Sequence, residues 1–182
     1  MSRRKPGKER IEAGLLRLLG NKPVRDVTVT ELCAQAQVSR STFYAHFANV
    51  DEVYRSLVRQ LIFDTSAMST QLRAGACADG TLRKPLCALV RDSAEYRGLV
   101  NDDAFIPTYF EMSSTEFHDE TLGVYLDICP DEETAQALCR FQIMGCIAAA
   151  KAADQSADWE RVKATLDTFI RGGLNAVRQA NG

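Results

Sequence analysis

Apolar side chains recur at helical spacing through most of this chain, and the alternation typical of strands is absent from the sequence. One stripe predicts a helix from about Lys8 to Leu19, which the run Gly-Asn-Lys-Pro ends. A longer stripe predicts a connector helix from about residue 49 to 72. The pattern therefore predicts an all-α protein.

Two further helices are expected at the C-terminal end of the chain. The first begins near Asp131, where acidic residues favour a helix start, and the last runs from about Asp158 to Arg178. Small residues on the first and an apolar stripe on the last suit close packing against a symmetry mate, although a purely internal core would show the same pattern. The residues expected at a dimer interface are Gly145, Ala149, Val162, Leu166, Phe169 and Ile170.

The middle of the chain is less regular. Ala74–Gly80 is expected to be a loop, Pro85 opens a segment with Leu86 and Leu89, and Asn101–Asp103 resembles a helix cap. Large adaptable side chains are then unusually frequent. They predict either plain core packing or a cavity for an apolar or aromatic small molecule. The candidate ligand-binding residues are Phe105, Tyr109, Phe110, Met112, Phe117, His118, Tyr125 and Phe141.

Two capping motifs mark a pair of short helices between the first helix and the connector. Thr28 and Glu31 have the spacing of a capping box, with Val27 and Leu32 at the staple positions. Ser39 is a good N-cap for the next helix. Helices this short cannot fold alone, so we expect them to pair across a tight turn as a helix-turn-helix.

The second short helix carries donors suited to nucleic acid. Its first turn holds Ser39, Arg40, Ser41 and Thr42 beside a positive helix end, and Tyr44 and His46 follow. An ordinary capped helix of a helical bundle would explain the first turn alone. The longer run of residues favours DNA binding.

The run from Thr28 to Phe47 resembles the DNA-binding head of the TetR/AcrR family of transcriptional regulators, and the similarity extends over roughly Lys8 to Val58. The resemblance implies that the second short helix lies in the major groove and that Tyr44 and His46 contact the DNA backbone. It also implies a homodimer formed through the last two helices. The DNA-binding residues so expected are Thr28, Thr30, Ser39, Arg40, Ser41, Thr42, Tyr44 and His46.

Two positions depart from the family pattern. The turn commonly carries Gly, but this chain has Gln37, which implies strain or an altered turn. The next helix commonly begins with a Lys near phosphate, but this chain has Val50. These departures leave open a rival hypothesis, in which the protein is a helical small-molecule receptor or partner-binding adaptor with a degenerate DNA head.

Charge is distributed unevenly along the 182 residues, although the net charge is only −2. Residues 1–59 hold 11 Lys and Arg against 6 Asp and Glu, whereas the remainder holds 11 against 18. A basic head on an acidic body suits nucleic-acid binding. Arg3, Arg4 and Lys5 form a short arm that either enters a minor groove or is simply mobile. No stretch approaches the ~20 apolar residues of a membrane span, so we expect a soluble cytoplasmic protein.

Catalytic and metal-binding signatures are missing from the sequence. The six cysteines form no Cys-x-x-Cys pair, and the chain has only two His. Buried thiols are the simplest interpretation, with redox sensing by Cys77 or Cys129 the alternative. We expect no metal, no cofactor and no enzymatic activity.

The sequence therefore predicts an N-terminal three-helix helix-turn-helix head over residues 1–58 and a C-terminal helical ligand-binding and dimerisation body over residues 59–182. The expected function is transcriptional regulation, as a homodimeric repressor that binds a palindromic double-stranded DNA operator and is released by a small-molecule effector.

Overall fold

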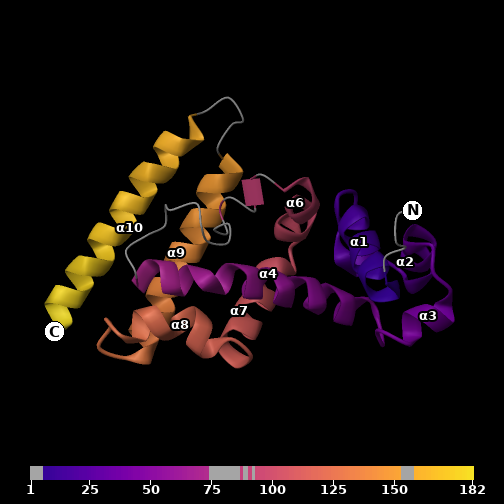
Figure 1. Cartoon of the computed structure of the whole chain (residues 1–182), viewed down its shortest axis with the longest axis horizontal. Coiled ribbons are helices and arrows are strands. Elements are labelled where there is room, and N and C mark those ends of the chain that lie inside the picture. Colours follow the sequence, from indigo (N-terminus) through magenta and orange to yellow (C-terminus); the bar gives the residue numbers. More distant parts are fainter. Residues whose placement is uncertain (1–5, 74–86, 88–89, 92, 153–157) are drawn as a thin grey trace. The chain divides into compact units, whose positions relative to one another are not determined.

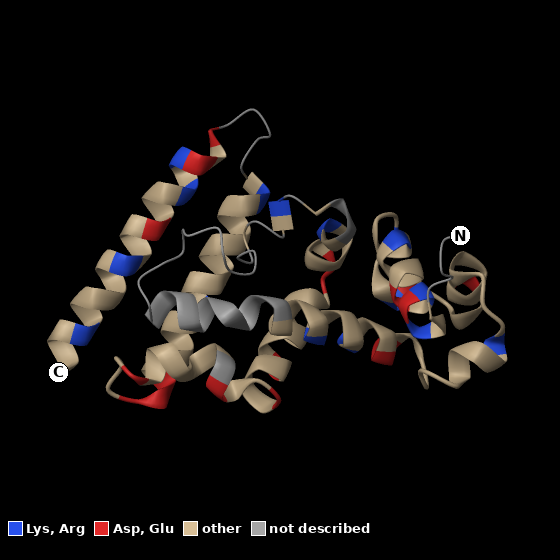
Figure 2. Ribbon diagram, in the orientation of Figure 1, with Lys and Arg blue, Asp and Glu red and all other residues tan. Residues whose placement is uncertain are grey.

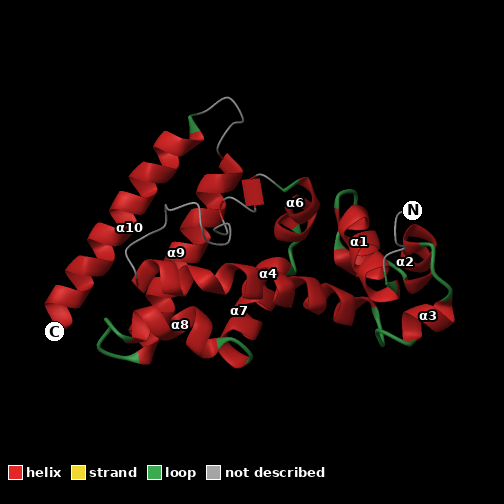
Figure 3. Cartoon of the chain, in the orientation of Figure 1, coloured by secondary structure: helices red, strands yellow, loops and turns green. Residues whose placement is uncertain are grey.

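The computed structural model describes residues 6–73, 87, 90–91, 93–152 and 158–182. Within these ranges the chain forms the α-helices labelled in Figure 1 and no strand, as the colours of Figure 3 show. The prediction of an all-α fold is therefore confirmed. The following predicted features lie outside the described residues: the basic arm Arg3–Lys5, the loop Ala74–Gly80 with Cys77, and Pro85, Leu86 and Leu89.

α1 (Gly7–Leu19) coincides with the first predicted helix. Ile11 and Leu15 on its apolar face are fully buried. Gly14 faces α2 so closely that an added Cβ would come within 3.1 Å of the Ala36 Cβ. The two helices therefore pack closely at this point.

α2 (Val29–Ala36) begins at the predicted capping box. Thr28 Oγ1 accepts the N–H of Glu31 at 3.2 Å, and a Glu31 carboxylate oxygen accepts the N–H of Thr28 at 3.1 Å. Val27 and Leu32, the staple residues, are both buried. The cap therefore satisfies the first N–H groups of the helix while the staple anchors it in the core.

α3 (Arg40–Tyr44) follows α2 after a short turn. α4 (Val50–Arg73) is the long connector helix that the sequence predicts. Phe43 in α3 and Phe47 in the link to α4 are both buried, with ring centroids 6.3 Å apart. The Asn49 side chain accepts the N–H of Glu52 at 2.8 Å and so caps the start of α4, close to where the sequence predicts the connector to begin.

The chain divides into two compact units, the first made of residues 1–61 and 93–111 and the second of residues 62–92 and 112–182. α4 continues from the first unit into the second. The first unit holds the predicted head and also α6 (Ala94–Asn101), which the sequence assigned to the body.

α6 meets the end of α1 through Gly98. A Cβ added there would come within 2.7 Å of the Leu19 carbonyl carbon and 2.8 Å of the Gly20 nitrogen. Only a glycine therefore permits this contact with the backbone that closes α1.

Asp102, between α6 and α7 (Phe105–Thr115), is a buried carboxylate that joins three segments. Its oxygens accept the Val24 N–H at 2.7 Å and the Ala104 N–H at 2.9 Å, and the Tyr54 hydroxyl lies 3.4 Å away. Burial, together with the charge of this carboxylate, raises the pKa of Tyr54. The predicted polar cap at Asn101–Asp103 is thus centred on Asp102.

The second unit contains α8 (His118–Leu126), α9 (Glu132–Ala152) and α10 (Trp159–Asn181). The Asn181 side chain donates to the Ile128 carbonyl at 3.1 Å and so ties the end of α10 to the α8–α9 turn. Among the helices that the structure describes, none is both long and apolar enough to cross a membrane.

Candidate nucleic-acid interface

The turn between α2 and α3 is built around Gln37 in a left-handed conformation. Its φ is 54° and its ψ is 45°, and among the described residues other than glycine only Gln37 has a positive φ. The Gln37 N–H donates to the Ala34 carbonyl at 3.1 Å and the Val38 N–H to the Cys33 carbonyl at 3.0 Å. This is the C-terminal capping pattern that usually takes Gly, so Gln37 costs about 1 kcal/mol in backbone strain.

Two arginines of α1 hold the carbonyl end of α2. The Arg10 guanidinium donates to the Gln37 carbonyl, and Arg17 donates to the Gln35 carbonyl at 3.0 Å. Cations at a helix C-terminus satisfy carbonyls that have no partner within the helix. α1 therefore braces the turn that sets the direction of α3.

α3 carries a compact set of hydroxyl groups on its first turn. Ser39 Oγ accepts the Thr42 N–H at 3.0 Å and lies 2.8 Å from both the Ser41 and the Thr42 hydroxyls. On the opposite side, Phe43 is fully buried and anchors the helix in the core. Because α3 has only five residues, its polar side chains rather than a helix dipole must carry any recognition.

Arg40 and Tyr44 lie together on the exposed face of α3. An Arg40 guanidinium nitrogen is 3.5 Å from the Tyr44 hydroxyl, and the guanidinium carbon is 6.0 Å from the ring centroid. Tyr44 is 52% exposed. The pair presents one cation and one hydroxyl outward from the same surface.

His46 lies beside the first residue of α1. A Cβ added at Gly7 would come within 2.9 Å of His46 Nε2 and 3.1 Å of the Thr42 methyl carbon. Lys8 adds a cation 6.0 Å from the centroid of the Phe47 ring. The start of α1 and the end of α3 therefore form one continuous polar edge.

The remaining predicted DNA-binding residues lie on α2. The Thr28 hydroxyl is used in the cap, whereas Thr30 is exposed on the first turn. Lys22 pairs with Glu31 at 2.6 Å. The Lys22 partner, followed by the N–H and hydroxyl of Thr28, lowers the pKa of Glu31 to about 2.

The predicted ligand-binding residues are spread over both units. Phe105 and Tyr109 are buried in the first unit with ring centroids 5.7 Å apart, and Phe110 stacks edge-on against Tyr109. Met112 and Tyr125 are buried in the second unit, where Phe117 is half-buried. The burial of these rings agrees with the core-packing alternative.

His118 and Phe141 occupy other surroundings. The His118 ring nitrogens lie 3.1 Å from an Asp119 oxygen and 3.3 Å from a Glu132 oxygen, and these contacts raise the pKa of His118. Phe141 is 67% exposed on α9. Neither side chain is buried with the other aromatic residues of the predicted set.

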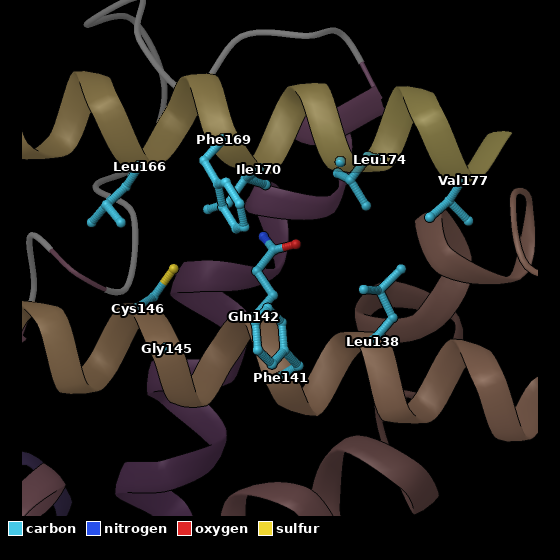
Figure 4. A pocket seen from close by; sticks show the side chains of 11 residues that line it. Leu138, Phe141, Gln142, Gly145, Cys146, Leu166, Phe169, Ile170, Leu174 and Val177 are labelled. Carbon is cyan, nitrogen blue, oxygen red and sulfur yellow. The ribbon is translucent and has the colours of Figure 1, made fainter. Parts of the chain in front are cut away.

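An apolar groove of about 330 Å³ lies between α9 and α10. Phe141 and Phe169, which line it, are 67% and 66% exposed, and Figure 4 shows the lining side chains of the two helices. Gln142 extends into the groove from α9. The lining residues are Leu138, Phe141, Gln142, Gly145, Cys146, Leu166, Phe169, Ile170, Gly173, Leu174 and Val177. The groove thus gathers four predicted dimer-interface residues, whereas Ala149 and Val162 do not line it.

Acidic positions gather on the second unit at the turn between α8 and α9 (Figure 2). Asp127, Asp131 and Glu132 are exposed there. Such a surface repels phosphate, so this turn is an unfavourable place for contact with DNA.

Cys33, Cys129 and Cys139 are free thiols. Burial raises the pKa of Cys139 to about 12, and it also raises the pKa of the half-buried Cys129. A thiol with a raised pKa is a poor nucleophile, which counts against redox sensing by Cys129. Within the part of the chain that the structure describes, no three His, Cys, Asp or Glu side chains are grouped to hold a metal ion.

Sequence reasoning missed the residues that support α3 from α1. Arg10 and Arg17 are spaced at i and i+7 and so lie two turns apart on one face of α1. This spacing is the feature of the sequence from which their shared role could be predicted. Gly7 gave no signal, because its role depends on contact with His46, a residue distant in sequence.

The N-terminal part of the chain, which contains α2 and α3, is similar to known proteins. Residues 11–57 match the bacterial regulatory proteins of the tetR family. The matched segment begins within α1 and ends within α4, so it covers the whole helix-turn-helix. No curated protein matches the chain. The match and the geometry of α2 and α3 agree: residues 11–57 form a DNA-binding head like that of the bacterial tetR regulators, and the chain is a DNA-binding transcription regulator.

Proposed function

We propose that the protein is a repressor that binds a palindromic operator as a homodimer and leaves it when a small molecule binds. The observation that carries the proposal is the exposed pair Arg40 and Tyr44 on α3, beside the Ser39 hydroxyl cluster. Arg can read guanine edges bidentately, and hydroxyl groups can donate to phosphates. A regulator of chromosomal DNA would work in the cytoplasm.

Assembly as a dimer is supported by the groove between α9 and α10. Phe141 and Phe169 leave two large rings in solvent next to an almost wholly apolar lining, which is costly for a monomer. A second copy of the same helix pair would cover these rings and form a four-helix bundle. Two heads on one dimer would then read half-sites about one helical turn, or a multiple, apart.

The effector is proposed to be apolar or aromatic, as the side chains of α7 and α8 suggest. Phe105 and Tyr109 are buried in the first unit, and Met112 and Tyr125 are buried in the second, so a ligand beside any of these side chains must displace core packing. A charged ligand would lose its hydration with few polar partners in return. Binding of the effector should lower the affinity for DNA, and DNA should lower the affinity for the effector by the same factor.

Selection from a random-sequence duplex library tests the proposal. The full-length protein is expected to enrich inverted repeats, and light scattering on the complex should give an even number of protomers per duplex. Enrichment of no sequence would instead favour the rival function, a helical adaptor or receptor whose head no longer binds DNA.

A further inference from the structure

The strained residue of the helix-turn-helix has no structural reason to be glutamine. Gln37 holds a left-handed backbone conformation that glycine adopts freely. Its N–H and carbonyl make the contacts of the turn, and any residue supplies these groups. Its side chain is exposed, and no hydrogen bond of its amide is found within the described part of the chain. A glycine would therefore build the same turn with less strain.

The position of Gln37 places the amide next to the recognition helix. Gln37 lies two residues before Ser39, the N-cap of α3. Arg10 holds its carbonyl from the α1 side, which fixes the backbone from which the side chain extends. Strain that persists in a folded protein is common at functional sites, where a side chain must be presented in one direction.

We propose that the Gln37 amide N–H groups donate to a phosphate oxygen of the operator, as an additional positioning contact of each head. This inference rests on the proposed DNA-binding function and deepens it. Phosphate is favoured over a base edge because the turn precedes the helix that enters the groove, where the sugar-phosphate backbone passes. The connector of this head begins with Val50, whose side chain has no hydrogen-bond donor. The Gln37 amide would supply a donor to phosphate that Val50 does not.

Replacing Gln37 by glycine tests this contact, because the affinity for DNA and the stability of the fold should change in opposite directions. In Gln37→Gly, the midpoint of thermal unfolding should rise, since the strain is relieved. Its affinity for duplexes enriched by the wild-type chain should fall at least about threefold, as for one lost hydrogen bond. The loss should be the same on every enriched duplex, because a phosphate contact carries no base information.

Three further variants isolate the amide. Gln37→Ala loses the same affinity as Gln37→Gly but should not gain stability, so it excludes a loosened turn as the cause. Gln37→Lys should bind more tightly and steepen the dependence of log K on log salt by about one for each head. Gln60→Ala removes another exposed glutamine, from α4, and should leave affinity unchanged.

The outcomes distinguish this inference from the proposed function. If the wild-type chain enriches no duplex, the DNA-binding function fails and this contact falls with it. If the wild type binds and Gln37→Ala binds equally well, only the Gln37 contact is wrong. A loss of affinity confined to duplexes with one particular base would overturn the assignment to phosphate.

Discussion

The carboxylate of Asp102 accepts the backbone N–H of Val24 at 2.7 Å, across 78 positions of sequence. Val24 begins the short 3₁₀ turn that leads into α2, and Asp102 ends α6. One buried side chain therefore fastens the segment after the connector to the loop that feeds the helix-turn-helix.

Asp102→Ala should destabilise the first unit by about 2 kcal/mol, because it leaves the Val24 N–H and the Tyr54 hydroxyl without their acceptor. Asp103→Ala is the matched control. Its side chain is 85% exposed and its pair with Arg25 should contribute less than about 1 kcal/mol. Urea unfolding measures both variants, and equal losses would show that Asp102 has no special role.

Arg40→Ala should weaken binding to enriched duplexes by about 1–3 kcal/mol and change the preferred base at one position of each half-site. Arg25→Ala removes the same charge from an exposed site outside α3 and should leave base preference unchanged. Fluorescence anisotropy over a set of single-base variants decides the matter. An unaltered preference in Arg40→Ala would mean that this side chain does not read bases.

Tyr44→Phe should weaken binding by a similar factor on all duplexes, since the hydroxyl is expected to contact phosphate. The same substitution at the buried Tyr54 is the control for losing a tyrosine hydroxyl without losing a DNA contact. It should lower the free energy of unfolding and spare affinity. A sequence-dependent loss in Tyr44→Phe would contradict the phosphate contact.

The capping box should make the head sensitive to acid. The pKa of Glu31 is about 2 in the folded chain, against an ordinary value of 4.5. A depressed carboxyl pKa stabilises the fold fully above the unfolded value, and this stabilisation is lost as the pH falls from about 4.5 toward 2. NMR titration of the Glu31 carboxyl should show the low pKa, and Lys22→Met should raise it. A Glu31 pKa that Lys22→Met leaves unchanged would contradict the ion pair as its main cause.

Phe169→Glu should yield monomers and weaken operator binding strongly, because a charge at an apolar seam is costly and two linked heads bind more tightly than one. Thr168→Glu places the same charge on the neighbouring position of α10, which is exposed and outside the groove. Light scattering should report a dimer for this control. If Phe169→Glu is a dimer of normal mass, Phe169 does not lie in the dimer interface.

Local features of the fold could be predicted from the sequence because their causes are local. The caps at Thr28 and Ser39 and the strained turn at Gln37 depend on residues within a few positions of one another. The contacts of Asp102 and Gly98 could not be predicted in this way, since they join segments far apart in the chain.

The aromatic residues show a second limit of sequence patterns. Periodicity identifies the apolar face of a helix but not the element that covers it. The sequence pattern therefore groups Phe141 with the aromatic residues of α7 and α8, whereas the structure places it in the lining of the groove with Phe169. Composition alone also could not distinguish buried core rings, such as Phe105, from rings around a cavity.

The most direct test of a DNA-binding regulator is the salt dependence of its affinity for a duplex that it enriches. The full-length chain is titrated onto the labelled duplex at several salt concentrations, beside a scrambled duplex of equal length. Log K should fall linearly with log salt by about 0.9 for each phosphate contact, with tighter binding to the enriched duplex throughout. Equal affinity for both duplexes, or an affinity that salt does not change, would contradict the assignment of α3 as a DNA-reading helix.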